Sequence, residues 1–286
     1  MMTVLSETAQ SPDTRKPLYT ELTAEFGEKC VLFYGVAMDG SVMIDDADAD
    51  VIEGILQKED LSNGLLMIIN APGGDGLAAE RIINVCSKYS RENFEVAVPK
   101  MAKSAATMIC FGANRIHMSQ TSELGPVDPQ LIRGDRMTSV HSMIESYRDL
   151  LDSAVRTEGN VEPYLQLLSR YDPSEIAEYQ KAQDLAESIS ITALKHGMLK
   201  SDTEVEIRKR IKIFTDATQT SSHGRRIGID DARGCGLTIE EIPLDSRKWE
   251  LIWELYCRTN WCLGNHLSTI VETQKYSFCA QARGRS

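Results

Sequence analysis

Hydrophobic residues in the first half of the chain form short continuous runs separated by a longer segment with helical periodicity. In residues 76–89 the apolar positions recur every three to four residues, which predicts an amphipathic helix. A further helix is predicted to start near Ser104, and a short strand at residues 115–118. Strands alternating with helices indicate a largely parallel sheet. The runs bounded by Gly, Pro or Asn, which predict buried strands, are residues 30–34, 65–69 and 94–98.

Beyond about residue 136 the pattern changes to long helices, predicted over residues 138–157 and 174–197. The second begins with Asp172-Pro173-Ser174-Glu175, a sequence typical of a helix start. The acidic run at residues 45–50 lacks the glycine and glutamate positions of a calcium loop and is interpreted as another helix start. We therefore expect an α/β protein in three parts, which are a flexible tail over 1–20, one large domain over 21–245 and a helical C-terminal extension over 246–286.

Composition limits the possible partners. The 286 residues are 42% hydrophobic and 26% charged, which is typical of a globular protein with a substantial core. The formal net charge of −11 makes nucleic acid an unexpected partner. The sequence contains no apolar run of about 18 residues and no signal-peptide pattern, so no transmembrane segment is expected. The seven cysteines are scattered and never spaced C-x-x-C, which favours reduced thiols and a cytoplasmic protein.

Two segments that contain candidate catalytic groups follow neighbouring predicted strands. The first, Asn70-Ala71-Pro72-Gly73-Gly74-Asp75-Gly76, contains glycines that let backbone N–H groups point into a cleft, as stabilisation of an oxyanion requires. A tight strand-to-helix turn is the alternative interpretation. The second places Ser104 at the start of a helix, where it is either a nucleophile or an ordinary N-cap. Both segments lie at carboxyl ends of strands, where parallel sheets bind ligands.

Together these motifs resemble a known family. Pro72-Gly73-Gly74, then Lys103-Ser104-Ala105-Ala106-Thr107 and the segment SELGPVDPQ at residues 122–130 are similar to the serine dehydrogenase proteinase family of Clp-fold serine peptidases. That family is related to signal peptide peptidase A and ClpP. The resemblance covers residues 28–135 and resumes more weakly at 228–237. It implies a ClpP/crotonase-like superhelix of β-β-α units with a mostly parallel sheet, and a peptidase domain over 21–245. The N-terminal membrane anchor of many relatives is not found here, so a soluble member is expected.

The resemblance also implies site residues and partners. Ser104 would be the nucleophile, and the N–H groups of Gly73, Gly74 and Ala105 would form the oxyanion hole for a polypeptide substrate. The family uses either a histidine or a lysine as base. We favour Lys181, in the helical region where the lysine branch places its base, although its position about 100° from the apolar stripe also suits a surface lysine. His223, in a polar loop, is the alternative. The other central histidines, at 117, 141 and 196, are interpreted as structural, and Lys103 as solvent-facing.

Two other functions stay open at this stage. A crotonase-like acyl-CoA enzyme would share the fold but use carboxylates for proton transfer. A catalytically silent scaffold would keep the fold and bind peptides without cleaving them. The resemblance further implies a homo-oligomer, and nothing in the sequence calls for a metal or an organic cofactor.

Overall fold

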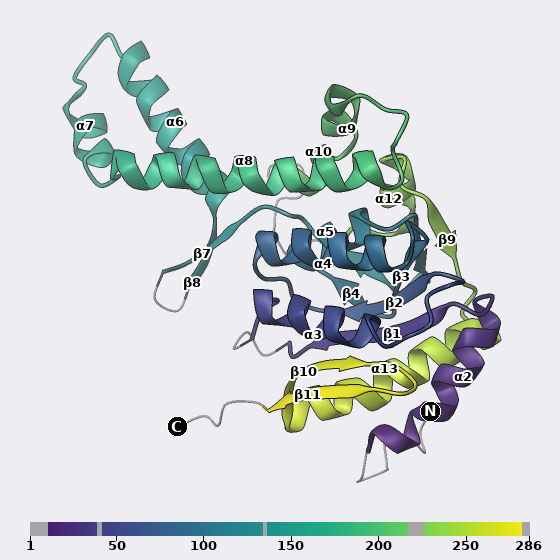
Figure 1. Cartoon of the computed structure of the whole chain (residues 1–286). Helices are drawn as coiled ribbons and strands as arrows, with labels where there is room; N and C mark the ends of the chain where they lie inside the picture. The colour runs from purple at the N-terminus through teal and green to yellow at the C-terminus, as the bar shows by residue number, and fades with distance from the viewer. Residues whose placement is uncertain (1–10, 39–41, 134–135, 217–225, 282–286) are drawn as a thin grey trace.

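The computed structural model describes residues 11–38, 42–133, 136–216 and 226–281, and its centre is a twisted sheet with helices on both faces (Figure 1). Within these residues the main sheet has seven strands in the order β11-β10-β1-β2-β3-β5-β9. Two small two-stranded sheets, β4-β6 and β7-β8, lie outside it. The architecture is therefore mixed α/β with a mostly parallel sheet, as the alternation of strands and helices predicted.

Five neighbouring strands of the sheet run parallel to one another, and they extend to one of its edges. Registers pair each with its neighbour, for example Leu32 with Met67 and Met67 with Val96. The strand at the centre is buried along its whole length because helices cover both faces, which explains its continuous apolar sequence. The predicted strands at residues 30–34, 65–69, 94–98 and 115–118 are confirmed, whereas the fifth parallel strand, at residues 239–241, was not predicted. The five strands are β1 (Cys30–Val36), β2 (Leu65–Asn70), β3 (Phe94–Val98), β5 (Arg115–Met118) and β9 (Ile239–Glu241).

Alternating strand residues divide into two cores. Leu32 and Tyr34 of β1 face the larger core, whereas Phe33 faces the other side of the sheet. The larger core packs against α3 (Asp46–Leu56), α4 (Gly76–Tyr89), α5 (Ala105–Phe111) and the C-terminal half of α8 (Pro173–His196). The opposite face is covered by α2 (Lys16–Glu25) and α13 (Arg247–Asn265). The predicted helices at 76–89 and 174–197 are thus confirmed.

The acidic run at residues 45–50 begins α3, as predicted. Asp45 and Asp48 form a capping box in which the side chain of Asp45 accepts from backbone N–H groups and Asp48 reaches back to the N–H of Asp45. Asp48 is buried and accepts a hydrogen bond from the Tyr34 hydroxyl at 2.6 Å. Burial raises the pKa of this carboxyl, although hydrogen bonds from Tyr34 and Asp45 favour its charged form.

Both ends of the described chain differ from the expectation. Residues 1–10 lie outside the described part, but a 3-10 helix (Pro12–Thr14) and α2 replace the flexible tail expected up to residue 20. The reason is that Leu18, Tyr19 and Leu22 form one buried face of α2. After α13 the chain forms the antiparallel strands β10 (Leu267–Glu272) and β11 (Ser277–Gln281), not more helix, and β10 pairs with β1. The β-branched run Thr269-Ile270-Val271 favours a strand.

Three helices project beyond the sheet (Figure 1). The hairpin of β7 (Gln130–Arg133) and β8 (Arg136–Ser139) leads into α6 (Val140–Arg156), then α7 (Glu162–Leu168) and α8. Between Ile144 and Ala186, a stretch described throughout, no side chain is buried. We call residues 145–185 the helical projection. The short helices α9 (Glu204–Arg210), α10 (Lys212–Thr215) and α12 (Ile229–Gly234) complete the described part of the chain.

Candidate active site

Backbone hydrogen bonds hold the glycine turn and the serine segment side by side. The strand β4 (Met101–Ala102) lies between Ala71 and β6 (Glu123–Leu124), parallel to both. The N–H of Ala71 donates to the carbonyl of Met101 at 3.3 Å, and the N–H of Lys103 donates to the carbonyl of Ala71 at 3.2 Å. The two segments that the sequence placed after neighbouring strands therefore meet, and Ser104 follows directly.

Ser104 has a backbone conformation that serines rarely adopt. Its φ is 50° and its ψ is −120°, at the start of α5. Such a conformation costs on the order of 1–3 kcal/mol and persists only where the surroundings impose it. Ser139 and Ser246, which begin α6 and α13, have φ of −63° and −83° and accept hydrogen bonds from their helices as ordinary N-caps.

The side chain of Ser104, by contrast, caps nothing. It makes no cap hydrogen bond with α5, and no side-chain partner for it is found in the described part of the chain. The side chain is partly exposed, and the N–H of Ser104 donates to the carbonyl of Pro126 at 3.1 Å. The N-cap interpretation of this serine therefore does not hold. The hydroxyl thus belongs to a partly exposed residue and makes no cap hydrogen bond.

Gly73 and Gly74 form the turn that faces the serine. Their φ values are 119° and 154°, in the region that favours glycine. A Cβ on Gly73 would lie 2.7 Å from the Cβ of Ser104, so no larger residue fits between the two segments. The turn is fixed from the other side by Ile44, whose N–H donates to the carbonyl of Gly73 at 2.9 Å and whose carbonyl accepts from Asp75 at 2.9 Å.

Three backbone donors near the serine have no protein acceptor. Within the described ranges, the N–H groups of Gly73, Gly74 and Ala105 donate to no backbone or side-chain group. Gly73 packs directly against Ser104, and Ala105 follows it in the chain. Unpartnered donors beside a serine hydroxyl are what a negatively charged tetrahedral oxygen needs.

The predicted bases do not lie in this cluster. Lys181 is exposed on the helical projection, where the alternative of a surface lysine placed it. His223 falls at 217–225, outside the described residues. Lys103 is not solvent-facing as expected, because its side chain is only 13% exposed and forms an ion pair with Glu123 at 2.9 Å. His117 is buried and bonded to Glu95 at 2.8 Å, consistent with a structural role.

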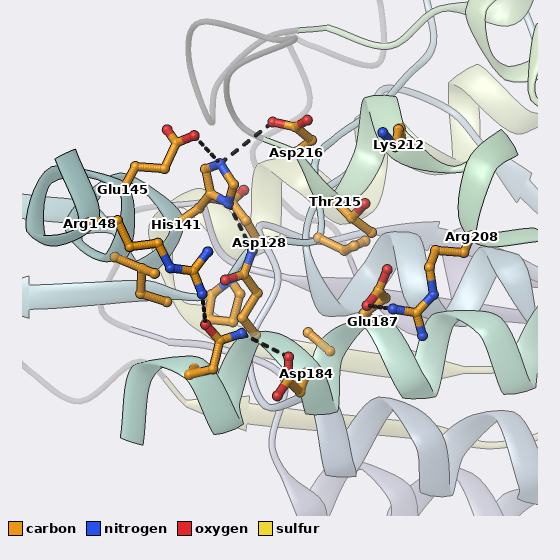
Figure 2. Close-up of a pocket in the computed structure, with 16 residues that line it drawn as sticks. Asp128, His141, Glu145, Arg148, Asp184, Glu187, Arg208, Lys212, Thr215 and Asp216 are labelled. Carbon is orange, nitrogen blue, oxygen red and sulfur yellow. Dashed lines mark hydrogen bonds and ion pairs between the residues drawn. The ribbon is translucent and has the colours of Figure 1, made fainter. Parts of the chain in front are cut away.

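A cavity of about 340 Å³, lined by several charged side chains, opens between the Val127–Pro129 segment and helices α6, α8 and α10 (Figure 2). His141 lies inside it, with its Nδ1 bonded to the amide of Gln183 at 2.8 Å. Its Nε2 lies at ion-pair distance from Glu145 (3.4 Å) and Asp216 (3.5 Å). Nε2 is buried and makes no hydrogen bond to either carboxylate within the described residues. Sequence reasoning missed this cluster because tertiary packing brings Gln183 and Asp216 to His141 from other helices and loops.

The segment that carries the glycine turn and Ser104 resembles a known family of proteins. Residues 22–153 match the model of the ClpP-like SDH-type serine proteinases. This part of the chain is therefore similar to that family. The match runs from α2 into α6 and includes both the glycine turn and Ser104. It confirms the resemblance derived from the motifs and gives no support to an acyl-CoA enzyme.

Two similar curated proteins come from Methanocaldococcus jannaschii. The uncharacterized protein MJ0137 is 30% identical over 112 residues, which is 39% of this chain and 38% of that protein. The uncharacterized protein MJ1495 is 31% identical over 105 residues, or 36% of this chain and 35% of that protein. The chain thus spans little more than a third of the length of these relatives.

The described residues were also compared with the requirements for a membrane span and for a metal site. None of their helices combines the length and apolar character needed to cross a bilayer. No cluster of three or more His, Cys, Asp or Glu side chains with the geometry of a metal site occurs in the described ranges.

Proposed function

We propose that this chain is a serine peptidase that hydrolyses peptide bonds through an acyl-enzyme on Ser104. The observation that carries the proposal is the backbone of Ser104. The residue is held at φ 50° beside Gly73 and its hydroxyl caps nothing, although the following helix offers N–H groups. Strain of this kind gathers at functional sites. The match of residues 22–153 to the model of a serine proteinase family supports the same function.

The chemistry follows from the groups around the serine. The Ser104 oxygen attacks the carbonyl carbon of a bound peptide, and the developing oxyanion accepts hydrogen bonds from the N–H groups of Gly73, Gly74 and Ala105. The hydroxyl proton passes to a base and then to the leaving amine. Water, deprotonated by the same base, attacks the ester and releases the acyl product. Each oxyanion donor typically contributes about 10²- to 10³-fold to the rate.

The sequence offers Lys181 and His223 for the base, and Lys181 stays our first choice. Because Lys181 is exposed in the single chain, it would have to be covered in the active assembly to give up its proton readily. The scattered cysteines form no disulfide within the described residues, which agrees with the reducing cytoplasm as the place of action. We further propose that the chain has the superhelix of β-β-α units that is typical of the family.

We also propose that the chain works as a homo-oligomer, joined through the helical projection. An amphipathic helix normally buries its apolar face, yet residues 145–185 bury no side chain. An exposed apolar surface of this kind marks an association site. Its large apolar side chains, each more than a third exposed, are Leu151, Val155, Val161, Leu165, Leu167 and Leu185.

Size-exclusion chromatography with light scattering tests the assembly. We expect the wild type to have a multiple of the 31.9 kDa chain mass and the double variant Val155→Asp/Leu165→Asp to have a smaller mass. Val205→Asp is the matched control, because Val205 is equally exposed but lies on α9, outside the projection. A wild type that is monomeric at every concentration would overturn the assembly.

Cleavage of casein tests the peptidase and its base. Wild type is compared with Ser104→Ala, Lys181→Ala and His223→Ala. Loss of the nucleophile is expected to lower the rate by up to about 10⁶-fold, and the base variant should show a loss of the same kind. Cleavage that survives Ser104→Ala would contradict the mechanism. A wild type that binds casein without cutting it would identify a silent scaffold instead.

A further inference from the structure

The hydroxyl of Thr107 lies at the junction of the segments that build the site. Thr107 is the third residue of α5 and is completely buried. Its hydroxyl donates to the carbonyl of Ala102 at 2.7 Å, with the carbonyl of Gly125 at 3.0 Å as a second acceptor for the same proton. It also accepts the N–H of Gly125 at 3.2 Å. One side chain thus joins β4, α5 and the loop after β6.

Both partners of this hydroxyl are neighbours of the groups that hold Ser104. Ala102 lies two residues before the serine, in the strand that pairs with Ala71 of the glycine turn. Gly125 directly precedes Pro126, whose carbonyl accepts the N–H of Ser104. Thr107 therefore fixes the chain on each side of the nucleophile. Valine, which has the same shape, would leave the Gly125 N–H without this acceptor and the Ala102 carbonyl without this donor.

A strained residue keeps its conformation only when several contacts impose it. Around Ser104 these contacts are the Lys103 bond to Ala71, the Ser104 bond to Pro126 and the two connections through Thr107. The Lys103–Ala71 and Ser104–Pro126 hydrogen bonds join backbone groups, so they do not depend on which side chains these residues carry. The hydroxyl of Thr107 is the contact in this group that depends on a side chain.

We infer that Thr107 is a positioning residue for the nucleophile. Its hydroxyl joins the Gly125–Pro126 loop to β4 by hydrogen bonds. It thereby holds the backbone of Ser104 in the conformation in which the serine oxygen and the oxyanion donors can act on the same substrate carbonyl. The inference rests on the proposed peptidase function and adds a residue to it. Thr107 is completely buried and touches no substrate, so it acts through Ser104 and its neighbours.

The test measures how fast a fluorophosphonate labels Ser104, followed by intact-protein mass spectrometry, and the steady-state hydrolysis of a fluorogenic peptide. Thr107→Val is expected to label about 10- to 100-fold more slowly, the loss typical of a small misplacement of a reacting group. Its kcat should fall while KM stays near the wild-type value, because no substrate contact is lost. Thr107→Ser keeps the hydroxyl and should recover most of the rate.

Thr259→Val is the matched control. Thr259 is also completely buried, and its hydroxyl donates to the carbonyl of Leu255 at 2.8 Å, with that of Tyr256 at 3.0 Å, on α13 across the sheet. Both valine variants should lower the thermal midpoint, but Thr259→Val should label at the wild-type rate. If Thr107→Val does not fold, Thr107→Ala compared with Thr107→Ser isolates the hydroxyl in the same way.

The outcomes separate this inference from the function on which it rests. A wild type that is never labelled at Ser104 would overturn both. A labelled wild type, together with a Thr107→Val that labels equally fast, would overturn the positioning role and leave the peptidase standing. Equal slowing in Thr107→Val and Thr259→Val, or no recovery in Thr107→Ser, would show that Thr107 merely contributes stability.

Discussion

At the scale of single residues, the contact between Gly73 and Ser104 sets the geometry of the proposed site. We predict that Gly73→Ala abolishes fluorophosphonate labelling of Ser104. The new Cβ would lie 2.7 Å from that of Ser104 and 2.9 Å from the Lys103 carbonyl oxygen, and the φ of 119° disfavours alanine. The free energy of unfolding, measured with urea, should fall by about 1–3 kcal/mol because of this strain.

Gly54→Ala is the control for that substitution. Gly54 lies within α3, and a Cβ there would meet no atom within 4 Å. Alanine should stabilise the helix by about 0.5–1 kcal/mol and leave labelling unchanged. Normal labelling of Gly73→Ala would show that the turn does not face the nucleophile as the structure indicates.

The sequence predicted the position of Ser104 but not its conformation. A strand end followed by an apolar helix is a local pattern, so it could be recognised from the neighbouring residues. The φ of 50° comes from contacts with Pro126 and from the pairing of Lys103 with Ala71, which are distant in sequence. The surroundings of His141 escaped prediction for the same reason, since Gln183 and Asp216 come from segments distant in sequence.

At the scale of elements, the hydrophobic pattern predicted the long helices and the continuously apolar strands. The strands β1, β2 and β3 and the helices α4, α6 and α8 were all predicted within about two residues. The two-residue strands β4 and β6 were not, because their pairing is imposed by the segments on either side. The hairpin β10–β11 was also missed, and there the β-branched residues of β10 offered a signal that the preceding helix pattern obscured.

The start of α3 gives a prediction about pH. Burial raises the pKa of Asp48 in the folded protein above its unfolded value, so the native state holds the proton more tightly. This contribution to stability is complete below the unfolded pKa and is lost as the pH rises through the folded pKa. Asp48→Asn can keep the acceptor for Tyr34 and Asp45, which both donate to the same carboxylate oxygen, without that dependence.

The free energy of unfolding of Asp48→Asn relative to wild type should therefore increase between about pH 3 and pH 7. Urea unfolding of both proteins at several pH values measures the difference. A difference that decreases as the pH rises would mean that the carboxylate is stabilised in the folded state, contrary to what its burial predicts.

At the scale of the whole molecule, a buried ion pair ties the two ends of the described chain together. Arg15 donates to Glu272 of β10 at 2.6 Å, with both side chains at most 2% exposed. Glu272→Gln would remove this buried negative charge from beside the Arg15 guanidinium and should lower the free energy of unfolding by about 3–5 kcal/mol. Asp13→Asn, which breaks the exposed pair with neighbouring Lys16, should change stability little in the same urea titration. A comparably small effect in both variants would contradict a structural role for the buried pair.

The central claim is that Ser104 is a nucleophile, and covalent labelling tests it most directly. Wild type, Ser104→Ala and Ser246→Ala are incubated with a fluorophosphonate and weighed intact, and the modified peptide is sequenced. Ser246 is the control because it also begins a helix but has ordinary cap geometry. The account predicts one adduct on Ser104 in wild type and in Ser246→Ala, and none in Ser104→Ala. An adduct that persists in Ser104→Ala, or a folded wild type that gains no mass, would contradict it.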